Sequence, residues 1–248
     1  MKIVGIIPAR YASTRFPGKP LALLQGKPMI LWTLQGAKQS RLLSDVFVAT
    51  DDERIATVVR DAGGKVVMTE SALPSGTDRV YAASSALEAD VLVNIQGDEP
   101  MVQGQMIDLL AEQFVNDPAL QMATLAHPLK ADDLNNLNAV KVVTDRYGFA
   151  LYFSRYPIPY SRVHPTGEQV VSGCSKHVGM YAYKKDFLQT FCASAPVELE
   201  IAESLEQLRA LHLGAKIKVV QIERAPTGVD TPEDMQKLEA QLAQKGSR

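Results

Sequence analysis

The sequence has little of the chemistry that marks several large protein classes. It contains two cysteines, Cys174 and Cys192, and no CxxC pair, so neither a disulfide framework nor a zinc site is indicated. No apolar run approaches the roughly 18–20 residues that a membrane-spanning helix needs. Lysine and arginine number 26 against 28 acidic residues, for a formal net charge of -2, and this balance excludes a general nucleic-acid binder. We therefore expect a soluble, cytoplasmic protein without nucleic-acid or membrane partners.

The 248 residues are 46% hydrophobic, which is enough for a packed core. Short apolar runs rich in Val and Ile predict strands that are buried on both faces. Longer segments with helical spacing lie between them. This alternation predicts an α/β fold with a doubly wound, mostly parallel sheet of the Rossmann-like type. The predicted strands are Ile3–Ile7, Val46–Ala49, Val66–Met68 and Val91–Ile95, and the predicted helices are Pro28–Ser40, Asp51–Ala62, Gln105–Val115, Val197–Leu213 and Thr231–Ala243.

The alternation is lost between residues 128 and 175. Two runs, Val140–Thr144 and Phe149–Phe153, are separated by a polar turn and predict a hairpin. A proline-rich stretch follows, and regular structure is expected again at Val178–Tyr183. We therefore predict a single domain, 1–248, in which 128–175 is an inserted β-rich subdomain that forms a partner interface.

The loop after the first strand, Pro8–Pro20, is strongly basic. Arg10, Arg15 and Lys19 fall within ten residues that contain no acid. In open parallel sheets, ligands bind at the carboxyl ends of the strands, and guanidinium and ammonium groups suit a triphosphate. The loop lacks both the GxGxxG and the GxxxxGK[ST] patterns, which argues against a nicotinamide oxidoreductase. A solvated basic loop that pairs with surface acids is the alternative.

Two aspartates are candidate metal ligands. Asp98 follows a buried strand in the run Gln96–Pro100, and Asp230 precedes the last predicted helix. Each has an ordinary structural interpretation, as a turn residue and as a helix N-cap respectively. If the two carboxylates converged to about 4 Å, they would repel by roughly 4 kcal/mol at an effective dielectric of 20. Convergence would therefore imply a bound cation such as Mg²⁺, or a raised pKa.

Other polar segments are less specific. The turn Ser75–Arg79 suits contacts to a base or ribose but equally suits a helix cap. His177 lies on one side of an extended segment together with Tyr181 and Tyr183, where a structural histidine is the usual case. Glu206 and Gln207 are expected on the helix side opposite Ile201, Leu205 and Leu208, where they would contact a sugar hydroxyl or only water.

Taken together and in order, these segments resemble the 3-deoxy-manno-octulosonate cytidylyltransferase (CMP-Kdo synthetase) family of the sugar nucleotidyltransferase superfamily. The resemblance covers essentially the whole chain. The opening loop alone would indicate only the wider superfamily, and the later segments select this family. The matching stretches are Ile7–Pro20, Ala49–Asp51, Ser75–Arg79, Asn94–Pro100, Asn138–Val143, Tyr152–Arg155, His177–Tyr181, Leu205–Arg209 and Gly228–Asp234.

The resemblance implies transfer of CMP from CTP to the 2-hydroxyl of Kdo, with release of pyrophosphate, for lipopolysaccharide biosynthesis. It also implies Mg²⁺ as cofactor and a homodimer joined through the inserted subdomain. Arg10, Lys19, Asp98 and Asp230 would carry catalysis, with both aspartates binding the metal. The nucleotide would contact Ala9, Arg10, Arg15, Lys19, Ser75, Gly76 and Thr77, and the sugar acid would contact Gln96, Arg155, His177, Tyr181, Glu206 and Gln207.

Two alternatives remain open at the level of sequence. The first keeps the chemistry but changes the acceptor to 8-amino-Kdo or another sugar acid such as sialic acid. The second is a non-catalytic nucleotide-binding protein on the same scaffold. The segment Val163–Gly167 matches nothing interpretable in the family pattern, whereas Glu99 within Gln96–Pro100 favours the Kdo type.

Overall fold

The computed structural model describes residues 1–12, 16–162 and 173–246. The chain divides into two compact units. The first unit comprises Met1–Ala111 and Pro226–Arg248, and the second unit comprises Glu112–Ala225. Arg15 and the segment Val163–Gly167 lie outside the described residues. No helix in the described part of the chain combines the length and the apolar character needed to cross a membrane.

The first unit is built on a parallel sheet with the strand order β5-β4-β1-β6. Because the chain starts in the middle of the sheet, goes outward through β4 and β5 and returns to the other side of β1 at β6, the order reverses between β1 and β6. Ligand sites of doubly wound sheets lie at such reversals. The predicted strands are confirmed as β1 (Ile3–Ala9), β4 (Asp45–Thr50), β5 (Lys65–Met68) and β6 (Val91–Asn94).

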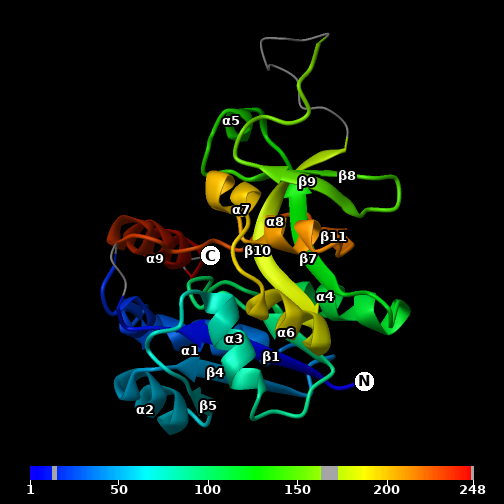
Figure 1. The fold of residues 1–248 in the computed structure, drawn as a ribbon. Helices are drawn as coiled ribbons and strands as arrows, with labels where there is room; N and C mark the ends of the chain where they lie inside the picture. The colour runs from blue at the N-terminus through cyan, green and yellow to red at the C-terminus, as the bar shows by residue number, and fades with distance from the viewer. Residues whose placement is uncertain (13–15, 163–172, 247–248) are drawn as a thin grey trace. The chain divides into compact units, whose positions relative to one another are not determined.

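Two helices of the first unit, α2 and α3, begin at a side-chain N-cap. Asp52 accepts a hydrogen bond from the backbone N–H of Arg54 at the start of α2, and Ser75 accepts one from Asp78 at the start of α3. Figure 1 shows α3 lying across the strands, and it packs against β1, β4 and β6. The helical elements are η1 (Lys19–Leu21), α1 (Met29–Ala37), α2 (Glu53–Asp61), α3 (Gly76–Ser84) and α9 (Pro232–Gly246), with α4 (Gly104–Asn116) crossing the unit boundary and β2 (Leu23–Leu24) and β3 (Lys27–Pro28) forming a small ribbon.

The start of the last helix, α9, shows that Asp230 is not its N-cap. The hydroxyl of Thr231 accepts a hydrogen bond from the backbone N–H of Asp234, so Thr231 is the N-cap of α9. The Asp234 carboxylate accepts hydrogen bonds from the backbone N–H groups of Thr231 and Asp230 in return. The N-cap interpretation of Asp230 is therefore wrong, and its carboxylate takes part in other interactions.

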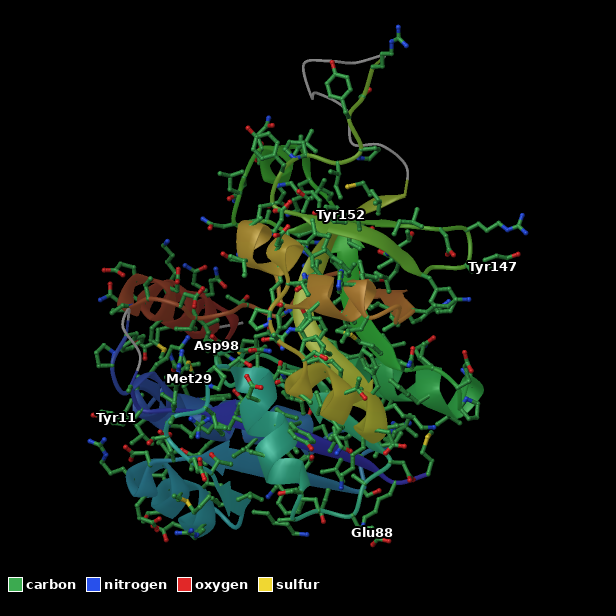
Figure 2. All side chains as sticks on the ribbon, viewed as in Figure 1. Tyr11, Met29, Glu88, Asp98, Tyr147 and Tyr152 are labelled. Atoms are coloured by element: carbon green, nitrogen blue, oxygen red, sulfur yellow. The ribbon has the colours of Figure 1, made fainter. Side chains whose placement is uncertain are left out.

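The second unit is mostly antiparallel. β7 pairs with β10, β10 with β8 and β8 with β9 in antiparallel fashion, and β11 lies parallel to β7. The predicted hairpin is confirmed as β8 and β9, and Figure 2 labels Tyr147 at its turn and Tyr152 on β9. The strands are β7 (Met122–Pro128), β8 (Lys141–Thr144), β9 (Ala150–Ser154), β10 (Cys174–Lys184) and β11 (Ile217–Gln221), and the helices are α5 (Ala131–Leu134), α6 (Lys185–Ala193), α7 (Glu198–Glu203) and α8 (Gln207–His212).

The single helix predicted over Val197–Leu213 is wrong. Two short helices, α7 and α8, take its place because Ser204 adopts a left-handed conformation with φ of 50°. Leu205 and Leu208 are buried as expected, but Ile201 is 66% exposed. Gln207, expected on the outer side, is only 3% exposed. The break turns Gln207 into the interior of the second unit.

Candidate active site

A pocket of about 240 Å³ opens in the first unit beside the reversal between β1 and β6. Its wall combines residues at and after the end of β1, residues that follow β6 and the start of α3. A basic loop and two carboxylates therefore face the same space. The lining residues are Pro8, Ala9, Arg10, Lys19, Pro20, Leu73, Ser75, Gly76, Arg79, Gln96, Gly97, Asp98 and Asp230.

Lys19 is the centre of the charged network in this pocket. Its Nζ donates to the Asp98 carboxylate at 2.8 Å and to the Val229 carbonyl at 3.0 Å, and it lies 3.6 Å from an Asp230 oxygen. Figure 2 labels Asp98 in the turn after β6. Both aspartates thus contact the same ammonium, and the positive charge of Lys19 relieves the repulsion between them.

Close backbone approach brings these loops together. The Val229 N–H donates to the Asp98 carbonyl at 2.9 Å, which joins the segment before α9 to the turn after β6. A Cβ on Gly97 would lie 2.8 Å from the Pro8 carbonyl oxygen, so only glycine fits there without displacing the end of β1. Gly18, with φ of 72°, packs against the Tyr11 ring and turns the basic loop into η1.

The wall on the α3 side holds a buried cation that sequence reasoning missed. Arg79 is 3% exposed, lies 3.4 Å from Asp51 and donates to the Thr69 hydroxyl. Burial lowers the pKa of Arg79, with Asp51 opposing that effect and Arg10 adding to it. Ser75 and Gly76 lie in the wall as predicted. Thr77 is buried instead, and its hydroxyl accepts a hydrogen bond from the Asn94 amide.

Glu99, next to Asp98, carries a buried carboxylate oxygen that has no hydrogen-bond partner among the described residues. Burial, followed by the charge of Asp98, raises the pKa of Glu99 to about 8. An unpaired buried carboxylate is costly to ionise, so Glu99 adds little negative charge beside the two aspartates near neutral pH.

In the second unit, three of the predicted sugar-acid residues are in reach of one another. The rings of His177 and Tyr181 have centroids 5.4 Å apart, and the charge of Glu206 acts on the Tyr181 hydroxyl. Burial lowers the pKa of His177 to about 3, so its imidazole is neutral. Gln207 follows Glu206, and its buried Nε2 has no hydrogen-bond partner in the described part of the chain. A buried donor of this kind costs stability unless a ligand uses it.

Arg155 has a structural role that the sequence did not indicate. Its guanidinium donates to the carbonyls of Glu203 at 2.6 Å, Leu137 at 3.0 Å and Ser204 at 3.2 Å. A cation at the end of α7 is favourable because carbonyl groups gather there. These bonds use three of the five guanidinium N–H groups. Carboxylate binding by Arg155 stays a prediction.

Of the predicted site residues, the pocket wall contains Ala9, Arg10, Lys19, Ser75, Gly76, Gln96, Asp98 and Asp230. The sequence motifs contain Asp51 and Arg79 but gave neither a role in the site. Arg79 is buried in the pocket wall and Asp51 is its half-buried ion-pair partner. Only the spatial pairing of the two residues draws attention to them.

A sequence model described as cytidylyltransferase matches residues 4–217. The fold and pocket thus define a nucleotide-transferring α/β protein. The 3-deoxy-manno-octulosonate cytidylyltransferase of Bdellovibrio bacteriovorus is 58% identical over 99% of this chain and 100% of its own. That of Geobacter metallireducens is 48% identical over 98% of both chains.

Solved structures agree with the sequence comparison. The structure of a CMP:2-keto-3-deoxy-manno-octonic acid synthetase complexed with CTP has a TM-score of 0.93 and 42% identity, covering 99% of this chain and 100% of that one. The chain therefore belongs to the cytidylyltransferase family, on the branch whose curated members are 3-deoxy-manno-octulosonate cytidylyltransferases. The resemblance inferred from the motifs is confirmed.

Proposed function

We propose that this chain is a Mg²⁺-dependent enzyme that transfers CMP from CTP to the 2-hydroxyl of Kdo and releases pyrophosphate. The observation that carries the proposal is the pocket in which Lys19 bridges Asp98 and Asp230 beside Arg10. The two relatives described above are named for the transfer of a cytidylyl group to 3-deoxy-manno-octulosonate. By this proposal the product is an activated sugar for lipopolysaccharide biosynthesis.

In this proposal the triphosphate binds Arg10 and Lys19, and Arg15, which the sequence places in the same loop, is a further candidate contact. Arg10 is exposed and lines the pocket, so its guanidinium is accessible to phosphate oxygens. The base and ribose lie against Ala9, Ser75 and Gly76, with Thr77 behind them. The two Pro residues at the ends of the loop, Pro8 and Pro20, stiffen this surface.

The two aspartates fit a magnesium ion. Mg²⁺ takes one or two carboxylates and completes its coordination with phosphate oxygens and water. Asp98 and Asp230 are two carboxylates close enough to share one ammonium, and among the described residues no larger cluster of metal-binding side chains exists. When bound, the ion would neutralise phosphate charge and acidify the attacking hydroxyl. Lys19 would then have its ammonium free for the phosphates.

The chain's own residues contribute mainly position and charge. The Kdo 2-hydroxyl attacks the α-phosphorus in line and its proton passes to solvent. The bond from that phosphorus to the bridging oxygen breaks, and pyrophosphate leaves with the electron pair. Arg10 and Lys19 oppose the charge that develops on the leaving group. Removal of one such preorganised group typically costs about 3–4 kcal/mol, or roughly 100- to 1,000-fold in rate.

The sugar acid, in the same proposal, binds His177, Tyr181, Glu206 and Gln207, together with Gln96 and Arg155. Hydroxyl groups of a polyol match this mixture of donors and acceptors. The unpartnered amide of Gln207 supports the assignment, because a buried donor without a partner is uncommon away from binding sites.

The test is pyrophosphate release with CTP and Mg²⁺ held constant and the acceptor varied among Kdo, 8-amino-Kdo and sialic acid. We expect turnover with Kdo and its loss in both Asp98→Asn and Asp230→Asn, each of which should remain folded. Wild-type rates in both variants would refute the metal roles. A higher kcat/KM with 8-amino-Kdo would refute the choice of acceptor, and calorimetric CTP binding without turnover would indicate a non-catalytic protein.

We also propose a cytoplasmic homodimer joined through the inserted segment 128–175, which belongs to the second unit. Of the large apolar side chains that are exposed among the described residues, most lie in this unit, including Tyr156 at 71%, Tyr160 at 76% and Ile201 at 66% exposed. Apolar side chains gathered on a surface commonly mark an interface. Sedimentation that shows only monomer at micromolar concentration would contradict the dimer.

A further inference from the structure

Strand β10 is interrupted between the two aromatic residues of the proposed sugar-acid site. Val178 pairs with Leu125 of β7, but the next pair is Tyr181 with Thr124. Two residues, Gly179 and Met180, are therefore inserted against a single step on the partner strand, which is a β-bulge. The rings of His177 and Tyr181, which lie before and after the bulge in the chain, have centroids 5.4 Å apart.

The hydroxyl of Thr124 closes this bulge. Thr124 is fully buried, and its Oγ1 lies 2.9 Å from the Met180 carbonyl and 3.2 Å from the Val178 carbonyl. The same oxygen lies 2.9 Å from Nε2 of His177. One hydroxyl thus contacts both carbonyls of the bulge and the imidazole that precedes it.

Counting protons determines which nitrogen of His177 carries hydrogen. A threonine hydroxyl has one proton to donate, and a carbonyl oxygen can only accept. The Thr124 proton therefore goes to a bulge carbonyl, since otherwise two carbonyl oxygens would face Oγ1 with no proton between them. Nε2 must then be the donor to Oγ1. The imidazole is neutral, as described above, so Nδ1 keeps its lone pair.

That lone pair has no donor within the described residues. The hydrogen bonds of the His177 side chain there consist of the one to Thr124, and Nδ1 is not among the fully buried polar atoms that lack a partner. The rings of Phe153 and Tyr181 both pack against the imidazole, with centroids 5.1 and 5.4 Å from its own. These contacts limit rotation of the ring, so Nδ1 is held as an acceptor.

We propose that Thr124 is a positioning residue that holds His177 as the Nε2–H tautomer, so that Nδ1 accepts a hydrogen bond from a hydroxyl of the sugar acid. The proposal rests on the proposed function for the identity of the ligand. It does not rest on it for the tautomer, which follows from the contacts of Thr124. Gln207 then supplies a hydrogen-bond donor and His177 an acceptor, and the hydroxyl groups of a sugar acid can both accept and donate.

The first experiment reads the tautomer directly. Nitrogen-15 NMR of histidine-labelled full-length protein separates protonated from unprotonated ring nitrogens, and a His177→Gln variant assigns the signals. We expect protonated Nε2 and unprotonated Nδ1, with the Nδ1 signal alone moving strongly when Kdo is added. A wild-type spectrum with the proton on Nδ1 overturns the proposal, as does an unmoved Nδ1 at a Kdo concentration that saturates turnover.

The second experiment compares Thr124→Val, which keeps the shape, with Thr124→Ser, which keeps the hydroxyl. We expect Thr124→Val to lose the Nε2–H preference and to raise KM for Kdo about tenfold, with KM for CTP within about twofold, because one oriented hydrogen bond is lost. Thr124→Ser should restore both. Thr190→Val, whose exposed hydroxyl donates only to the Asp186 carbonyl, is the matched control and should change neither.

The possible failures are distinguishable. If Thr124→Val retains the wild-type tautomer and KM, Thr124 has no positioning role and the proposal is wrong. If Thr124→Val does not fold, the wild-type spectrum and its response to Kdo still decide the matter. Absence of pyrophosphate release by the wild-type protein with Kdo would refute the proposed function. The tautomer of His177 would still show whether Thr124 positions it.

Discussion

Replacing Lys19 by Met removes the cation that joins the turn after β6 to the segment before α9. The change removes the contacts to Asp98 at 2.8 Å, to the Val229 carbonyl at 3.0 Å and to Asp230 at 3.6 Å. The side chains of the two aspartates are 34% and 52% exposed, so water screens both the lost attraction and the new repulsion. We therefore expect the free energy of unfolding to fall by only about 1 kcal/mol.

The effect of the same change on catalysis should be much larger. Charge on the leaving pyrophosphate develops in the transition state, where a preorganised ammonium is worth about 3–4 kcal/mol. We expect kcat/KM to fall roughly 100- to 1,000-fold in a pyrophosphate-release assay, with urea unfolding measured in parallel. Lys65→Met is the matched control, because it removes an exposed ion pair with Asp45 in the same unit and should leave the rate unchanged.

Two results would refute this reasoning. A Lys19→Met variant that keeps kcat/KM within about threefold of wild type would show that the ammonium does not act in the transition state. A loss of stability above about 4 kcal/mol would show that Lys19 is chiefly structural.

Substitutions at three other positions, Gly97, Gln207 and His177, should have distinct effects. Gly97→Ala should lower the free energy of unfolding by about 1–3 kcal/mol and raise KM for CTP, because its Cβ would lie 2.8 Å from the Pro8 carbonyl oxygen. Gly76→Ala is the control, since its Cβ would lie 3.5 Å from a Pro8 carbon, and urea unfolding should show a smaller loss of stability. Gln207→Met removes an amide that has no partner in the described part of the chain, so the free energy of unfolding should stay unchanged or rise by about 1 kcal/mol. KM for Kdo should rise in the same variant. A clear loss of stability would contradict this prediction. Burial lowers the pKa of His177 from 6.5 to about 3 in the folded protein. Its contribution to stability is therefore present above pH 6.5 and is lost as pH falls toward 3, by at most about 1.4 kcal/mol per pH unit. His177→Gln should flatten this part of the plot of unfolding free energy against pH, and plots of the same slope for variant and wild type would refute the prediction.

Strands β1 and β6 of the parallel sheet were predictable because they are apolar on both faces. The expected burial of Val66–Met68 is wrong, because β5 lies at the edge of the sheet and none of its side chains is buried. Runs such as Ile3–Ile7 and Val91–Ile95 bury every side chain, and a local pattern is enough to identify them. The helix predicted over Val197–Leu213 failed for the opposite reason. Its apolar spacing is compatible with a continuous helix, but the left-handed turn at Ser204 is held by long-range bonds to Arg155. Local periodicity contains no information about such bonds.

The candidate site residues divide in a similar way. Arg10, Lys19 and Asp98 were predicted because they follow strands in the sequence, in loops where charged side chains seldom belong to the core, and all three line the pocket. Asp230 was ambiguous, and the structure resolved the ambiguity by assigning the cap to Thr231. Thr124 was not identified at all, because a threonine in a buried strand is unremarkable until its partners across the sheet are known.

The sequence by itself determined the fold class, the family and the basic loop, since each depends on residue types in a linear order. Tertiary structure decided which charges meet. Lys19, Asp98 and Asp230 are up to 211 positions apart (19 to 230) and converge only because the ends of β1 and β6 are neighbours and α9 returns to the first unit. It also decided burial, and with it the neutral state of His177 and the unpartnered amide of Gln207. Desolvation depends on what surrounds a group in space, and the order of residues along the chain does not specify those surroundings locally.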